Sequence, residues 1–323
     1  MPVKKARELM ENVVICGAAR TPIGGFQGAL YAVPAARLGG AAIEAALQQT
    51  SLSSVDEVVM GNVLGAGQGQ APARQASFHA GLGAQVPATT LNKMCGSGMK
   101  ATMIGFDQIA LGQTQVMAVG GMESMSNAPY LLPKMRGGAR LGHSQVADHM
   151  FLDGLEDAYE NGRLMGSFAE DCAEKYQFTR EAQDDYALRS LIRAREAQSS
   201  GAFENEITPL KLARKKGDYA VMQDEQPLNA KPEKIPHLKP AFRADGSVTA
   251  ANASSISDGA AALIVSSQTH MQQAGLPCRA RILGHASHAQ EPAWFSTAPI
   301  FATRKLLDRL NWRGGDVNLL GGN

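Results

Sequence analysis

A cysteine followed by two glycines, at the start of a helical pattern, is the part of this sequence best suited to covalent chemistry. Cys95 ends a short apolar run, and Gly96 and Gly98 lead into a segment with helical periodicity. Unpaired N–H groups and the dipole at a helix N-terminus favour negative charge, and this setting lowers the pKa of a cysteine from about 8.5. The pattern predicts that Cys95 is a thiolate nucleophile; a buried structural cysteine before a glycine turn is the alternative.

The other three cysteines form no metal-binding or redox pattern. Cys16, Cys172 and Cys278 lie far apart, and no two cysteines have the Cys-x-x-Cys spacing. A zinc cluster or a redox dithiol is therefore not expected, and the expected location is the reducing cytoplasm. Cys16 lies in an apolar run, which indicates a structural role.

Strand-like and helix-like segments alternate around Cys95. Apolar runs typical of strands lie at 13–18, 58–60, 88–91 and 116–119, and helical patterns lie at 35–49, 71–80 and 99–111. This alternation predicts an α/β fold with a mostly parallel sheet and helical crossovers. Between residues 98 and 111 only Lys100 and Asp107 carry charge, so we expect this helix to be buried on most sides, between layers.

The composition changes between residues 127 and 245, where proline, glycine and charge increase. Charged helices are expected at 144–159, 167–176 and 180–198, followed by a basic cluster at Lys211, Arg214, Lys215 and Lys216. The cluster is either a solvated surface or a site that attracts phosphate groups. Beyond it, strands are expected at 258–267 and 279–285, and a helix at 298–311.

Bulk composition argues against several classes of partner. The 323 residues carry a net charge of +1, with 44% hydrophobic and 19% charged residues. So small a charge gives no field that attracts nucleic acid or a membrane surface. No apolar run reaches the roughly 20 residues that span a bilayer, and the first residues lack the apolar core of a secretory signal. Residues 65–69 lack the spacing of a dinucleotide-binding loop and predict a plain loop.

Four segments, in this order, resemble the thiolase family: 14–24, 90–101, 120–126 and 248–262. The resemblance implies a five-layer αβαβα core with an inserted loop domain, and a second half that is only partly present. It divides the chain into an N-terminal half carrying the nucleophile (1–126), a loop domain over the coenzyme A site (127–245), a return to the N-terminal half (246–275) and part of the C-terminal half (276–323).

The resemblance also implies a reaction. Thiolases transfer acyl groups between coenzyme A (CoA) thioesters, and Cys95 matches their acyl-accepting cysteine. The implied substrates are acetyl-CoA and acetoacetyl-CoA, joined by condensation or its reverse, thiolysis. The N–H groups of Cys95 and of a loop glycine are natural donors to the thioester oxyanions. No metal and no tightly bound cofactor is implied, since CoA is substrate and product. A homo-oligomer, dimer or tetramer, is expected.

Six residues match CoA-contacting positions of the family. Ala250 and Ser254 match contacts to the pantetheine arm, Ala241 and Phe242 lie near the adenine end, and Leu155 and Met165 match the tunnel wall. For Phe242 and Met165 the alternative is simple packing. Short-chain members carry a histidine where Leu164 stands, and an arginine common near residues 227–228 is absent, so the resemblance is weakest at the phosphate end.

Three family motifs of the second half are not complete in this sequence: Asn-Glu-Ala-Phe, Gly-His-Pro and Cys-x-Gly-Gly-Gly. No histidine is followed by proline, no cysteine follows Cys278, and Asn323 aligns with the first asparagine. We therefore expect a C-terminally incomplete thiolase whose 323-residue form has thiolysis near background. The alternatives are a non-catalytic homologue that binds CoA thioesters or oligomerises and, less favoured, a ketoacyl synthase-type condensing enzyme.

Overall fold

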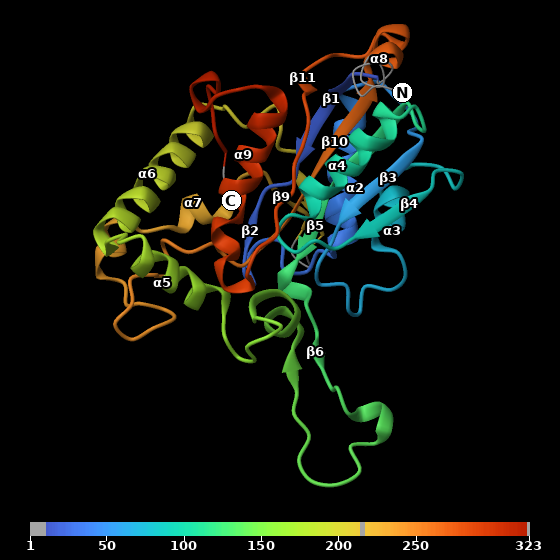
Figure 1. The fold of residues 1–323 in the computed structure, drawn as a ribbon. Helices are drawn as coiled ribbons and strands as arrows, with labels where there is room; N and C mark the ends of the chain where they lie inside the picture. The colour runs from blue at the N-terminus through green and yellow to red at the C-terminus, as the bar shows by residue number, and fades with distance from the viewer. Residues whose placement is uncertain (1–10, 214–216, 322–323) are drawn as a thin grey trace.

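The computed structural model describes residues 11–213 and 217–321, and a mixed sheet lies at its centre (Figure 1). The seven strands follow the order β11-β1-β10-β5-β3-β4, with β2 paired to β10. Their bounds are β1 (Val13–Arg20), β2 (Gly24–Gly25), β3 (Glu57–Gly61), β4 (Ala88–Leu91), β5 (Val116–Ser124), β10 (Ser257–Ser267) and β11 (Ala280–Ile282).

The expectation of a mostly parallel sheet is wrong. β3 is parallel to β4 and to β5, but β10 runs antiparallel to both β1 and β5, and β11 runs antiparallel to β1. The physical reason lies in the inserted segment. The chain leaves the sheet after β5 and returns with β10 between β1 and β5, in a direction that local patterning does not encode.

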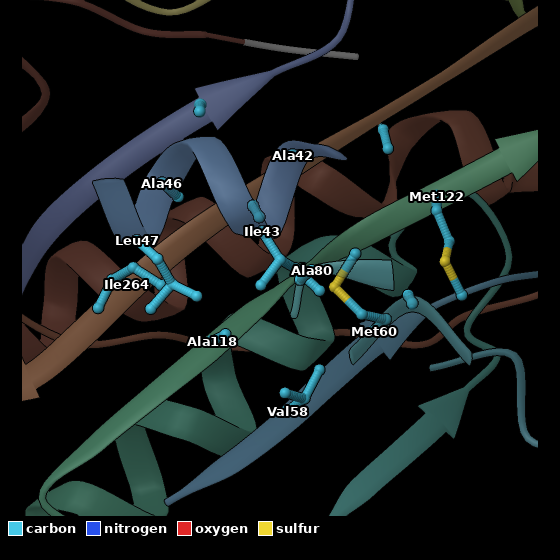
Figure 2. Packing of buried hydrophobic residues seen from close by; sticks show 14 of the residues in the cluster. Ala42, Ile43, Ala46, Leu47, Val58, Met60, Ala80, Ala118, Met122 and Ile264 are labelled. Atoms are coloured by element: carbon cyan, nitrogen blue, oxygen red, sulfur yellow. The ribbon is translucent and has the colours of Figure 1, made fainter. Parts of the chain in front are cut away.

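Two helices cover one face of the sheet. α2 (Ala35–Gln48) and α3 (Pro72–His79) share an apolar cluster with the sheet. Figure 2 shows side chains of α2, among them Ile43 and Leu47, pointing toward Ile264 on β10 and Ala118 on β5. Gly17 of β1 permits the close approach of α2, because a Cβ there would lie 2.3 Å from the carbonyl oxygen of Ala46.

The opposite face carries α4 (Ser97–Ala110), the helix that follows Cys95. Ala101 and Ile109 are buried with Val119 of β5 and Val265 of β10. Met99, by contrast, is 68% exposed. Met99 is the one exposed residue of α4, and its other residues are buried or partly buried, so the expectation of a helix buried on most sides holds except at its first turn. Apolar composition shows what a helix can bury, but not which partner covers each face.

The segment between β5 and β10 carries little sheet and several helices. Its elements are η1 (Met125–Asn127), β6 (Tyr130–Leu131), η2 (Met135–Gly137), β7 (Ala147–Asp148), η3 (Phe151–Leu155), α5 (Met165–Lys175), α6 (Arg180–Ser199), β8 (Leu210–Leu212), β9 (Tyr219–Val221), α7 (Glu225–Asn229) and η4 (Pro232–His237). The helix expected at 144–159 is wrong: this stretch pairs β7 with β6 and then forms the π-helical turn η3. A π-helix is seldom longer than a turn and gives no hydrophobic period to read.

Three carboxylates attach this inserted segment to the sheet, and of these Asp224 is buried. Arg20 at the end of β1 donates to Glu206 at 2.7 Å and to both oxygens of Asp224 at 2.7 and 3.0 Å. Glu225 accepts N–H bonds from Gly25 and Ala29, each at 2.9 Å. These bonds join residues about 200 positions apart and fix the insertion on the edge near β2.

The last described elements are α8 (Gln268–Ala274), β11, η5 (Pro292–Thr297), α9 (Ala298–Leu310) and η6 (Gly314–Asp316). The loop after β11 leads the chain to the α4 side. His285 Nε2 lies 2.8 Å from Asp107 Oδ1 of α4, and Arg309 of α9 donates to the carbonyl of His285 at 3.0 Å. These contacts hold α9 beside the C-terminal half of α4 and leave its N-terminal end accessible.

Candidate active site

Cys95 lies on a strained turn between β4 and α4, immediately before Gly96, the N-cap residue of α4. Met94 has a φ of 49°, in the left-handed region, and holding a non-glycine residue there costs about 1–3 kcal/mol. Ser97 Oγ accepts the Lys93 N–H at 2.8 Å and donates to the Met94 carbonyl at 2.6 Å. The hydroxyl therefore clamps the backbone just ahead of Cys95.

Glycines let this turn rest directly on the ends of β3 and β5. A Cβ on Gly61 would lie 2.5 Å from Cβ of Ser97, and one on Gly98 would lie 3.4 Å from the Gly121 nitrogen. Because neither Gly61 nor Gly121 carries a side chain, the turn packs directly on the backbone of β3 and β5. This placement puts Cys95 at the carboxyl ends of two parallel strands, where α/β folds commonly hold their ligands.

The Cys95 thiol is accessible, as a nucleophile requires. Cys95 is exposed, Cys172 is half-buried and Cys278 is exposed, whereas Cys16 is buried. Burial, with a smaller contribution from nearby Cys278, raises the pKa of Cys16 to about 11. Cys16 is thus held as a thiol inside the sheet–α2 core, in agreement with a structural role.

Glu123 on β5 organises the loop that follows β3. Its carboxylate accepts hydrogen bonds from Asn62 Nδ2 at 2.7 Å and from the N–H groups of Val63 and Leu64 at 2.8 and 3.1 Å. Burial raises the pKa of Glu123 above its ordinary value, and these two backbone bonds oppose that shift. Glu123 therefore fixes residues 62–64 beside the Cys95 turn, where Asn92 Nδ2 reaches the Val63 carbonyl at 3.5 Å.

Three of the residues expected to contact CoA lie together in the inserted segment. Leu155 ends η3, and the next residue, Glu156, forms an antiparallel bridge with Leu164, which precedes Met165. A Cβ on Gly166 would lie 2.3 Å from ring carbons of Phe242, so that ring packs directly on the first turn of α5. The structure therefore brings Leu155, Met165 and Phe242 into one neighbourhood.

The other three expected contacts lie on a loop anchored by buried acids. Ala241 donates its N–H to the Val248 carbonyl at 2.9 Å. Glu170 of α5, 1% exposed, accepts the N–H groups of Ser247 and Val248. Beyond this anchor, Asn252 donates to Asp184 at 3.0 Å. The loop presents Ala241, Ala250 and Ser254 at the surface, all three exposed.

Sequence reasoning missed the residues that hold these loops, Ser97, Glu123 and Glu170. Glu123 gave a usable signal, because it is the one charged residue in the small and apolar run 116–126. Ser97 and Glu170 gave none, since each acts on backbone groups that only the fold brings near. Asn323 lies outside the described residues, as do Arg214, Lys215 and Lys216 of the basic cluster.

The described residues contain neither a cluster suited to a metal ion nor a helix suited to a membrane. Across 11–213 and 217–321, no cluster of three or more His, Cys, Asp or Glu side chains is arranged to hold a metal ion. In the same ranges, no helix combines the length and the apolar character needed to cross a membrane.

Comparison with known proteins places this architecture in a family. The model of the thiolase N-terminal domain matches residues 13–269. An acetyl-CoA acetyltransferase of Pseudomonas aeruginosa is 48% identical over 318 residues, covering 97% of this chain and 81% of that protein. Acetyl-CoA acetyltransferase 2 of Arabidopsis thaliana is 49% identical over 312 residues, covering 95% of this chain and 77% of that protein.

Solved structures agree. The acetyl-CoA acetyltransferase of Syntrophomonas wolfei superposes with a TM-score of 0.91 at 38% identity, over 96% of this chain and 78% of that one. The Acat5 thiolase of Ascaris suum, solved in complex with coenzyme A, gives 0.89 at 38% identity, over 96% and 80%. The predicted thiolase-like α/β fold is confirmed. With its cysteine turn, its sheet order and the match across 13–269, the chain belongs to the thiolase family.

Proposed function

We propose that this protein transfers acyl groups between CoA thioesters, with the Cys95 sulfur as the acyl acceptor. The observation that carries the proposal is an exposed thiol on a strained, clamped turn at the start of α4. The relatives named as acetyl-CoA acetyltransferases support acetyl-CoA and acetoacetyl-CoA as the substrates. CoA is then a substrate and product, and no tightly bound cofactor takes part.

The proposed reaction consists of two transfers. In the first, the Cys95 thiolate attacks the thioester carbonyl of acetyl-CoA; a sulfur–carbon bond forms to Cys95, the bond to the CoA sulfur breaks, and CoA leaves as its thiolate. In the second, another acetyl-CoA loses a proton from its α-carbon, and this proton ends, by way of solvent, on the CoA thiolate. The resulting carbanion attacks the acetyl group, the bond from that group to the Cys95 sulfur breaks, and acetoacetyl-CoA and the Cys95 thiolate are formed. Backbone N–H groups at the turn, including that of Cys95, stabilise the oxyanions. Thiolysis is the reverse sequence.

The proposed CoA site is formed by the inserted segment and the loop it anchors. Leu155, Met165 and Phe242 form an apolar wall, and Ala241, Ala250 and Ser254 line the exposed loop beside it. Apolar walls with a few placed polar groups are typical of small-molecule sites. The tight packing of Phe242 on Gly166 supports this arrangement, because it leaves the ring little freedom to move.

Acetylation of the protein by acetyl-CoA tests the proposal. Intact-mass and peptide mass spectrometry should find a single acetyl group on Cys95, lost in Cys95→Ser. Cys278→Ser is the matched control, because Cys278 is also an exposed thiol but lies on the approach to β11. Labelling of Cys278 in preference to Cys95 would contradict the proposed nucleophile.

The second candidate is a homologue that binds CoA thioesters without turnover. This candidate predicts CoA binding with no acetylated Cys95. For the 323-residue form we propose that acetylation occurs and that thiolysis of acetoacetyl-CoA stays near background. We further propose that the protein is a homo-oligomer, a dimer or tetramer, which light scattering tests, and that it is cytoplasmic, which cell fractionation tests. The proposed domain boundaries lie at residues 126, 245 and 275.

A further inference from the structure

A buried histidine joins the β3 loop to the π-helical turn η3. His149 is 5% exposed. Its Nδ1 lies 2.6 Å from Asp153 Oδ2, and its Nε2 lies 3.3 Å from the Ala66 nitrogen. The two ring nitrogens thus contact two segments: Asp153 belongs to η3, and Ala66 belongs to the loop whose first residues are held by Glu123.

These partners assign the tautomer of His149. The Ala66 N–H is a donor, so Nε2 must accept and carries no proton. The Asp153 carboxylate is an acceptor, so Nδ1 carries the proton and donates. A neutral imidazole protonated at Nδ1 satisfies both bonds at once, and a proton on Nε2 would remove the bond to Ala66. The acidic groups near the ring are Asp153, on η3, and Glu123, on β5.

The β3 loop is the structural link between the Cys95 turn and η3. On one side Asn92, three residues before Cys95, donates to the Val63 carbonyl. On the other side a Cβ on Gly154 would lie 3.3 Å from Cδ2 of Leu64. Gly154 directly precedes Leu155, the wall residue proposed above. Residues 62–66 therefore contact both the Cys95 turn and η3, and they set the position of Leu155 relative to Cys95.

We propose that His149 is a positioning residue for CoA thioester binding: as the Nδ1–H tautomer it holds η3, and with it Leu155, against the loop that supports the Cys95 turn. The inference rests on the proposed function. η3 needs such an external tie, because an isolated π-helical turn is a rare and costly conformation. A hydrogen-bonded buried histidine also adds stability, so the test separates stability from positioning.

Two substitutions each remove one of the two hydrogen bonds of the His149 ring. His149→Asn places an amide nitrogen near Nδ1 and keeps the donation to Asp153, but it has no acceptor for Ala66. His149→Gln places an amide oxygen near Nε2 and keeps the acceptor for Ala66, but loses the bond to Asp153. Each variant loses one hydrogen bond, so their unfolding transitions in urea should shift by similar amounts.

The rate of Cys95 acetylation is measured against acetyl-CoA concentration in both variants, together with Cys95 alkylation by iodoacetamide. In His149→Asn we expect the half-saturating concentration to rise about tenfold, the equivalent of one buried hydrogen bond. The limiting rate and the alkylation rate should change less than twofold. In His149→Gln, which keeps the tie to the loop, the half-saturating concentration should stay within about threefold of the parent value.

The outcomes are distinct. Equal effects of both variants, or effects that follow stability alone, would overturn the positioning role while leaving Cys95 acetylation intact. A loss of alkylation in His149→Asn would also overturn it, since the histidine would then act on the thiol and not on the CoA wall. If the parent protein is not acetylated at all, the proposed function fails first, and this inference fails with it.

Discussion

Removal of the Ser97 hydroxyl should slow the acetylation of Cys95 while the protein stays folded. Ser97 is 5% exposed, and its Oγ makes two bonds, with the Lys93 N–H and the Met94 carbonyl. Ser97→Ala removes both and leaves the Lys93 N–H without this acceptor. At about 1 kcal/mol net for each bond, and more for a stranded donor, the loss is about 2–3 kcal/mol of unfolding free energy.

The same change should slow acetylation of Cys95 much more than stability alone explains. Met94 is held at a φ of 49°, and without the clamp its backbone can relax and carry Cys95 away from its position. Displacements of about 1 Å in a reacting group cost up to a hundredfold in rate, so we expect a decrease between about tenfold and a hundredfold. The assay is acetylation of Cys95 by acetyl-CoA, followed by mass spectrometry.

Thr50→Val is the matched control. Thr50 is 4% exposed, donates to the Leu47 carbonyl at 2.8 Å and accepts the Leu52 N–H at 3.3 Å. Thr50 therefore makes the same two kinds of bond as Ser97. It lies in the turn before β3, and the Cys95 turn contacts Gly61, at the opposite end of that strand. The variant should lose similar stability with unchanged acetylation. The reasoning is refuted if Ser97→Ala acetylates at the parent rate, or if both variants slow equally.

Three further predictions follow from contacts and pKa shifts. In Gly166→Ala the added methyl displaces the Phe242 ring and should raise the Kd for CoA about tenfold by calorimetry, whereas Gly315→Ala, which meets nothing within 4 Å, should leave it unchanged. Because the pKa of Cys16 is about 11, iodoacetamide near neutral pH should label Cys95 and spare Cys16 until urea unfolds the protein; labelling of folded Cys16 would contradict its burial. Burial, with a smaller contribution from the charge of Glu225, raises the pKa of Asp258 above its unfolded value of about 3.9. The native state therefore binds this proton more tightly than the unfolded state does. The resulting stabilisation is present at acid pH and is lost as pH rises through the folded pKa. Asp258→Asn should remove that loss, and parallel urea profiles for the two proteins from acid to neutral pH would disprove it.

The sequence predicts the elements of the core well and their pairing poorly. The strand expected at 88–91 and the helices expected at 35–49 and 298–311 agree with β4, α2 and α9 to within one residue. Their patterns are local, since hydrophobic period and end residues lie within each segment. The antiparallel pairing of β10 with β1 and β5 joins segments separated by an insertion of more than a hundred residues, so no local sequence pattern predicts it.

For the site, the sequence identifies the reactive group but not its support. Cys95 stands out because a cysteine between an apolar run and two glycines is a local signal. The π-helical turn at η3 was missed, because residues 144–159 carry charge and apolar side chains at a spacing that also suits an ordinary helix. The carboxylates that hold the loops accept backbone N–H groups distant in sequence, as Glu170 does from Val248, and no side-chain pattern announces a backbone partner.

These carboxylates explain how an insertion with little sheet can hold a binding surface in place. Glu225 ties the insertion to the turn after β2, Glu170 ties α5 to the loop of Ala250, and Glu123 ties β5 to the loop after β3. Each carboxylate accepts hydrogen bonds from two backbone N–H groups, and such charge-assisted bonds are stronger than neutral ones. The apolar core then fixes the Cys95 turn, while acid–amide bonds fix the proposed CoA wall. Substitution of Glu170, which lies away from the Cys95 turn, should therefore alter CoA binding before it alters the rate at which iodoacetamide alkylates Cys95.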